Sequence, residues 1–176
     1  MRRPKKLFSN LLLTTLVTLS CASAANARTW HVNVEDDLFS DTGKKAFLSS
    51  PGNFHPLVFN CDSSGISIAL LERSQQTRDE TRDYAAPVTL IVKVDDSDPI
   101  RLAATWSRRN EHYFHAEVDD KESLPDIVKT LKQIQAAKSK VLVGIQFNTK
   151  NFSESIRVTG STAATTTFLK ACGVDK

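Results

Sequence analysis

One pair of histidines has a spacing that could bind a metal ion. His112 and His115 are three residues apart, and Glu111 and Glu117 flank them. Imidazole and carboxylate groups together are common Zn²⁺ ligands. On a β-strand, however, side chains at positions 112 and 115 point to opposite faces, so the two rings cannot share one ion without a bulge. The spacing therefore favours ordinary surface or core histidines, and no metal site is predicted.

Three aspartates form a second cluster. Asp95, Asp96 and Asp98 carry the oxygen ligands that Ca²⁺ prefers. An EF-hand loop also needs a central glycine and a bidentate glutamate, and neither follows at the right spacing. Because Asp, Ser and Pro are common turn residues, we predict a hairpin turn over residues 95–99.

The sequence lacks the motifs that commonly mark an active site. Ser, His and Asp all occur, but no Gly-x-Ser-x-Gly motif places a nucleophile. The chain has neither a P-loop nor a Gly-x-Gly-x-x-Gly motif. We therefore predict a protein that is not an enzyme, with no catalytic residue and no cofactor. A small envelope hydrolase with dispersed catalytic residues is the alternative.

The N-terminal residues have the pattern of a secretory signal peptide. Four basic residues precede a short apolar run over 11–19, which is too short to span a bilayer. Ala22-Ser-Ala24 and Ala25-Asn-Ala27 both match a small-x-small cleavage site. Cleavage after Ala27 is favoured, so the predicted mature chain starts at Arg28. Lipidation of Cys21 is the alternative. The pattern predicts a periplasmic or secreted protein with no transmembrane segment in its mature part.

Cleavage would also change the charge. The whole chain has a formal charge of +3, and residues 1–27 contain four basic residues and no acids, so the mature charge is −1. Nothing in this balance favours a nucleic acid as partner.

Two cysteines would remain in the mature chain. An oxidising compartment favours a disulfide, and Cys61 and Cys172 allow only one connectivity. The bond would close a loop of roughly 110 residues, for which the chain-entropy model gives about 4–5 kcal/mol as an upper figure. Two free buried thiols are the alternative.

Alternating apolar residues predict a mainly antiparallel β fold. The clearest part is a three-stranded meander over 88–94, 100–106 and 112–118, joined by short turns. A hairpin is expected over 57–61 and 66–71. Further strands are expected, in order, over 30–34, 46–50, 141–147 and 155–158. The polar stretch 74–83 is predicted to be a surface loop, with a short charged helix as the alternative.

Two helices complete the prediction. The first starts at Ser123, and its apolar residues recur at helical spacing. They are Leu124, Ile127, Val128, Leu131 and Ile134. The second is short, with Ser161 or Thr162 as N-cap and with Ala164, Phe168 and either Ala171 or Cys172 on its apolar face. Together these elements predict one disulfide-stapled domain over 28–176, an antiparallel β-sandwich with one amphipathic helix and a short C-terminal helix.

The order of these features resembles the VasI/TagO accessory family of bacterial type VI secretion. The likeness covers roughly residues 88–172: a helix, a lysine-bearing turn and strand, then Ile156-Arg-Val-Thr-Gly160 and Thr162-Ala-Ala…Phe168-Leu-Lys-Ala-Cys172. Ile156 stands where the family pattern has Phe. The resemblance implies a periplasmic accessory or interaction role and no catalytic residues.

We therefore expect a module that binds a protein partner in the cell envelope, with no nucleic acid involved. An inhibitor or immunity-type binder is the closest alternative. Arg108 and Arg109 follow the middle meander strand. Because guanidinium groups are favoured at interfaces, these two residues are the predicted partner-binding site, with an ordinary solvated turn as the alternative.

Overall fold

A computed structural model describes residues 29–52, 55–73, 84–148 and 150–175 of the chain. The predicted signal peptide and the predicted loop over 74–83 lie outside these residues. The described elements are the strands β1 (His31–Asp36), β2 (Lys44–Ser49), β3 (Leu57–Asp62), β4 (Gly65–Arg73), β5 (Ala86–Val94), β6 (Ile100–Arg108), β7 (Tyr113–Val118), β8 (Lys140–Phe147) and β9 (Lys150–Arg157), and the helices α1 (Leu124–Ala136) and α2 (Ser161–Ala171).

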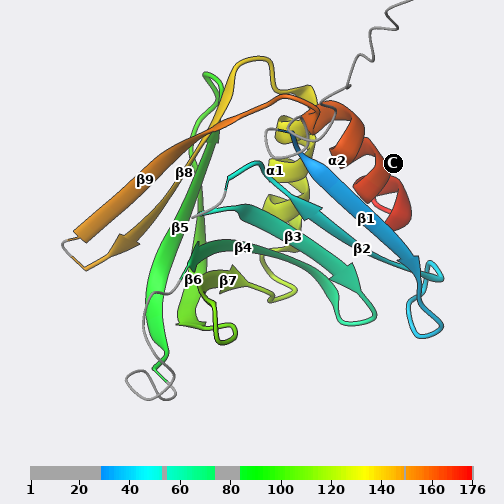
Figure 1. Ribbon diagram of the computed structural model, residues 1–176, viewed down its shortest axis with the longest axis horizontal. Helices are drawn as coiled ribbons and strands as arrows, with labels where there is room; N and C mark the ends of the chain where they lie inside the picture. Colours follow the sequence, from blue (N-terminus) through cyan, green and yellow to red (C-terminus); the bar gives the residue numbers. More distant parts are fainter. Residues whose placement is uncertain (1–28, 53–54, 74–83, 149, 176) are drawn as a thin grey trace, which may run out of the picture.

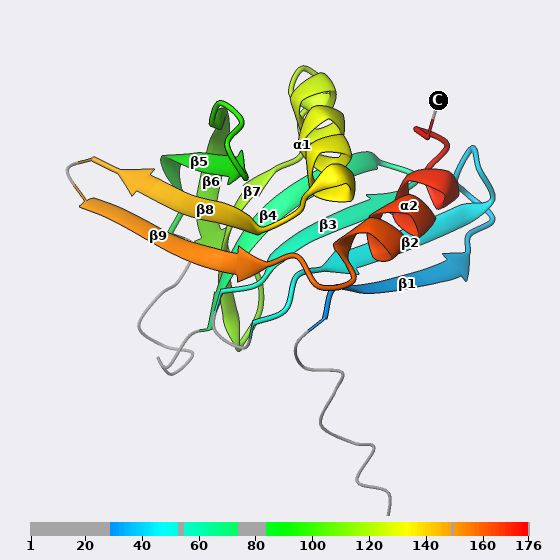
Figure 2. The ribbon, with the colours of Figure 1, turned by 90° about the horizontal axis from the view of Figure 1, so that it is seen from above.

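All the described strands belong to one antiparallel sheet. Their order is β1-β2-β3-β4-β7-β6-β5-β8-β9. The sheet curls into a half-barrel, and both helices lie on its concave side (Figures 1 and 2). The prediction of a mainly antiparallel β fold with two helices is confirmed. The sandwich is not found, because the helices cover the apolar face that a second sheet would cover.

The predicted strand pairs match the structure. β3 and β4 form the expected hairpin, with Cys61 opposite Ile66. β5, β6 and β7 form the expected meander, although β6 extends to Arg108 and β7 begins at Tyr113. The hairpin joins the meander where β4 pairs with β7. This pairing makes one continuous sheet out of two units that are local in sequence.

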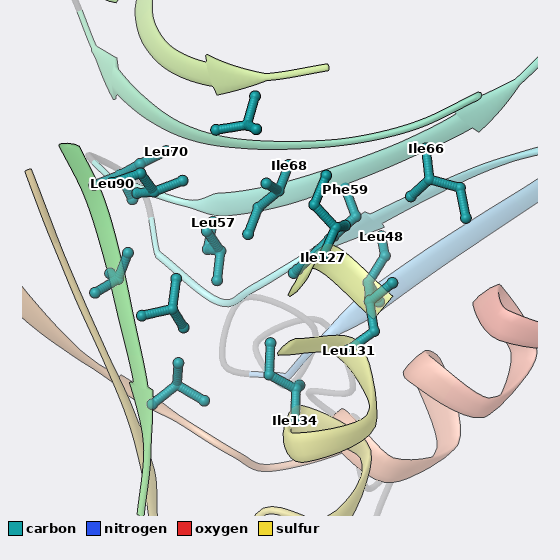
Figure 3. Close-up of a cluster of buried hydrophobic side chains, with 14 of the residues drawn as sticks. Leu48, Leu57, Phe59, Ile66, Ile68, Leu70, Leu90, Ile127, Leu131 and Ile134 are labelled. Atoms are coloured by element: carbon teal, nitrogen blue, oxygen red, sulfur yellow. The ribbon is translucent and has the colours of Figure 1, made fainter. Parts of the chain in front are cut away.

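Helix α1 supplies the centre of the core. Ile127, Leu131 and Ile134 are fully buried and point toward the side chains of β2, β3 and β4 (Figure 3). The predicted apolar face is wrong at one end, because Leu124 is exposed and Val128 is only partly buried. Thr130 is buried instead, and its hydroxyl donates to the carbonyl of Asp126 at 2.8 Å, which satisfies its polar group inside the helix.

Helix α2 packs beside α1 and is tied to the sheet. Cys172, its C-cap, forms a disulfide with Cys61 of β3, with the two Cα atoms 6.1 Å apart. The predicted N-cap is wrong, since the cap is Gly160, whose φ of 78° is left-handed. The expected apolar face over Ala164, Phe168 and Cys172 is buried. The predicted bond is therefore present, and it anchors a helix that is rich in β-branched threonine.

The two edges of the half-barrel meet at one end. Trp30, which directly precedes β1, is buried, and its backbone N–H donates to the carbonyl of Thr159 at 3.0 Å. The indole N–H of Trp30 also donates to the carbonyl of Arg157 at 2.8 Å. These two hydrogen bonds join the start of β1 to the C-terminal end of β9. The rest of the outer edge of β9 lies farther along the strand from this contact.

Asp95, one of the three clustered aspartates, makes hydrogen bonds that the predicted hairpin turn did not include. The carboxylate of Asp95 accepts hydrogen bonds from the backbone N–H groups of Lys138, Ser139 and Lys140 at 2.7–2.9 Å, and from the Ser139 hydroxyl at 2.6 Å. Asp95 thus connects the turn after β5 to the segment between α1 and β8. The Ser139 hydroxyl and these N–H groups hold the pKa of Asp95 well below its usual range.

Asp95→Asn is expected to lower the melting temperature at neutral pH, because the amide keeps only one oxygen for this set of donors. A carboxylate whose folded pKa is depressed adds stability above its unfolded pKa of about 3.9, and that stability is lost as the pH falls further. The difference in melting temperature between wild type and variant should therefore become smaller below about pH 4. Thermal denaturation across pH 2–8 measures it, with Asp96→Asn as the matched control. A difference in melting temperature that stays constant down to pH 2 would contradict this account.

Candidate functional site

The concave side of the half-barrel contains an apolar pocket. Its volume is about 260 Å³. The pocket lies between the meander, the end of β4 and the β8–β9 hairpin. The side chains around it are His55, Leu70, Leu71, Glu72, Tyr84, Val88, Trp106, Ile145, Phe147, Lys150, Asn151 and Phe152.

The pocket wall on the meander side is held in place by stacked aromatic rings. The rings of Trp106 and Phe114 lie 5.8 Å apart and 6° from parallel. The guanidinium of Arg108 lies 5.9 Å from the centre of the Phe114 ring. Offset stacking and a cation–π contact both hold Trp106 in one orientation. This wall is therefore preformed, which favours binding because no ordering of the side chain is needed.

The opposite rim is formed by β9 and a histidine from the loop before β3. Nδ1 of His55 lies 2.9 Å from a carboxylate oxygen of Glu154. The ring of His55 also contacts Phe152, with 4.4 Å between ring centres. Phe152 remains 38% exposed at this rim. An exposed aromatic ring beside an apolar pocket is typical of a binding surface.

Backbone groups of β9 point outward along the same rim. Arg157 directs its carbonyl away from β8, toward Trp30. Because backbone groups in an antiparallel strand alternate in direction, the N–H and C=O groups of Asn151, Ser153 and Ser155 also point away from β8. β9 ends the strand order, so within the described residues no strand pairs with this edge.

The β8–β9 hairpin projects from the body of the sheet (Figures 1 and 2). Its two strands are close where Gly144 faces Ser153. A Cβ atom at Gly144 would lie 2.5 Å from the carbonyl oxygen of Phe152, so no larger residue fits there without moving β9. Gly144 therefore allows the close approach that sets the position of the exposed edge.

The two arginines predicted to bind a partner lie on opposite faces of the sheet. Arg108 lies on the concave side above Phe114 and donates to the carbonyl of Asn110 at 3.2 Å. Arg109 lies on the convex side, 3.7 Å from Glu117. The two side chains therefore do not form one basic patch, and their role in partner binding stays a prediction.

The histidine pair also separates. His112 precedes β7, whereas His115 lies within it and is buried on the convex face. Ser107 of β6 is its cross-strand neighbour, and Oγ of Ser107 lies 2.8 Å from Nε2 of His115. Nδ1 of His115 lies 3.1 Å from Glu117. Sequence reasoning missed this set because it depends on strand register, although the two-residue spacing of His115 and Glu117 already places both on one face.

In residues 29–52, 55–73, 84–148 and 150–175, no group of three His, Cys, Asp or Glu side chains is arranged to hold a metal ion. Neither α1 nor α2, the helices of this part, has the length and apolar character needed to cross a membrane.

Comparisons with family models, curated proteins and solved structures give no match for this chain.

Proposed function

We propose that the protein is an exported accessory protein of the bacterial envelope that acts by binding a protein partner. The basic and apolar pattern of residues 1–27 supports export, and the Cys61–Cys172 disulfide fits an oxidising compartment such as the periplasm. The resemblance to VasI/TagO proteins over residues 88–172 supports an accessory role in type VI secretion. The geometry of β9 and the adjacent pocket supports a specific mode of binding.

In this mode, an extended segment of the partner adds to the outer edge of β9. The observation that carries the proposal is that this edge runs beside a preformed apolar pocket. Strand addition gives affinity through main-chain hydrogen bonds, and pockets for alternate side chains give specificity. The outward groups of Asn151, Ser153 and Ser155 would provide the hydrogen bonds.

The pocket would receive an apolar side chain of the same segment. Its volume of about 260 Å³ lies just under the range of roughly 300–1,000 Å³ typical of small-molecule sites. A site of this size suits one large side chain or two smaller ones better than an extended lipid chain. Trp106 and Phe152 offer aromatic surfaces for contact with such an anchor.

A peptide library displayed on phage tests this proposal without knowledge of the natural partner. Panning against the oxidised mature protein should enrich peptides in which apolar residues alternate with polar ones. Ser153→Pro removes one outward N–H and should weaken binding of the enriched peptides at least tenfold. Ser153→Ala is the matched control, because it keeps the N–H group and should bind as wild type does.

A second variant tests the pocket. Val88→Trp would fill part of it and should weaken the same peptides, with circular dichroism used to check that the fold is intact. Equal binding by wild type, Ser153→Pro and Val88→Trp would contradict the proposed mode. Failure to enrich any peptide above background would also contradict it.

A further inference from the structure

A second hollow, which we call the convex hollow, lies outside the apolar pocket and spans β5, β6, β8 and β9. Its volume is about 340 Å³, within the range of roughly 300–1,000 Å³ typical of small-molecule sites. The residues around it are Ile91, Lys93, Pro99, Arg101, Leu142, Val143, Gly144, Ile145, Gln146, Asn151, Phe152 and Ser153. None of these residues is acidic, and two of them are basic.

The strand register explains where the convex hollow forms. Ile91 of β5 pairs with Arg101 of β6 on one side and with Gly144 of β8 on the other, and Gly144 pairs with Ser153 of β9. The neighbours of Ile91 along β5 are fully buried in the core, so this row of four residues lies on the convex face. Gly144 has no side chain, which leaves a space in the row between Ile91 and Ser153.

Two basic side chains lie at the β5–β6 end of the convex hollow. Lys93 is two residues beyond Ile91, the partner of Arg101, so the two cations are diagonal neighbours roughly 7–8 Å apart on one face. Arg101 is exposed and Lys93 is partly exposed. Within the described residues, neither side chain forms an ion pair. Two unneutralised like charges at this spacing repel each other, and an anion between them would replace the repulsion with attraction.

The rest of the convex hollow is neutral. Ile91 and Leu142 provide apolar surface beside the two cations, since Leu142 is the cross-strand neighbour of Lys93. The amides of Gln146 and Asn151 and the hydroxyl of Ser153 lie toward the β8–β9 end. The convex hollow therefore has one positive end, an apolar middle and one neutral end with hydrogen-bonding groups. This distribution fits an anionic group attached to a small body that carries hydroxyl groups.

We propose that the convex hollow binds a phosphate monoester. A phosphate monoester carries a charge of about −1.5 to −2 at pH 7 and three acceptor oxygens, so it can pair with both cations at once. The planar guanidinium of Arg101 can donate to two phosphate oxygens, and the ammonium of Lys93 adds a compact charge. A carboxylate has only one charge and two oxygens for the same two cations. The body of the ester would lie over Gly144, with its hydroxyl groups near Asn151 and Ser153.

A phosphate monoester can be a soluble molecule or the headgroup of a lipid, and two probes distinguish these sources. The first is glycerol phosphate, titrated into the isotope-labelled oxidised mature protein. The amide signals of Ile91, Gly144 and Ser153 should shift and saturate with a Kd below about 1 mM. The second is a vesicle of phosphatidylcholine and phosphatidic acid, with pure phosphatidylcholine as its control. Binding of the free probe assigns a soluble ester, and binding of the phosphatidic acid vesicle alone assigns a lipid headgroup.

A charge-matched pair of variants tests whether the two cations form the site. Lys93→Gln/Arg101→Gln should weaken binding of the probe at least about tenfold, because a hydrogen bond between charged groups contributes more than a neutral one. Lys129→Gln/Lys170→Gln removes the same charge from exposed positions on α1 and α2 and should bind as wild type does. Equal weakening by the two double variants would overturn the proposal. Absence of saturable binding of both probes to wild type would overturn it as well.

Discussion

Cys172→Ser is expected to lower the free energy of unfolding by about 2–5 kcal/mol, as removal of a native disulfide does in small secreted domains. The bond joins β3 to the C-cap of α2 across 111 residues, so its loss greatly increases the freedom of the unfolded chain. It also releases a short helix that contains three successive threonines. Urea denaturation of the oxidised proteins measures the difference.

The double variant Cys61→Ser/Cys172→Ser is the control. A single replacement already breaks the bond, so the second should add little to the loss of stability. Alkylation and peptide mapping of the native protein should find no free thiol at either position. Two alkylatable cysteines in native protein, or a Cys172→Ser variant as stable as wild type, would contradict the assignment.

Leu131→Ala is expected to destabilise the protein by about 2–5 kcal/mol, the usual cost of removing a large side chain from a core. Leu131 is fully buried between α1 and the sheet, among the side chains shown in Figure 3. Lys129→Ala, on the exposed side of the same helix, is the matched control and should change stability by less than about 0.5 kcal/mol. Similar losses from both variants would show that α1 does not bury this face.

Local patterns predicted the elements well, because strand and helix periodicities depend on neighbouring residues. The alternation over 88–94 and the helical spacing of Ile127, Leu131 and Ile134 correspond to β5 and α1. The sandwich was wrong for a non-local reason. Pairing of β4 with β7 joins the hairpin to the meander in one sheet, and no local pattern specifies which strand edges meet.

The candidate sites were less predictable than the elements. The pocket combines residues from β4, β5, β6, β8 and β9, so its existence depends on how far the sheet curls. The contact between Ser107 and His115 depends on the register across one turn. Arg108 and Arg109, singled out from their charge, project to opposite faces because side chains alternate along the chain there. The charge of the two residues does not indicate the face of the sheet to which each side chain projects.

Amide hydrogen exchange in the presence of a β9-binding peptide tests the central claim, strand addition at this edge, most directly. The N–H groups of Asn151, Ser153 and Ser155 point away from β8, whereas those of Phe152 and Glu154 point toward it. At saturating peptide, exchange at Asn151, Ser153 and Ser155 should slow at least tenfold, while Phe152 and Glu154 change little. Unchanged exchange at all three outward amides, with the peptide bound, would contradict the account.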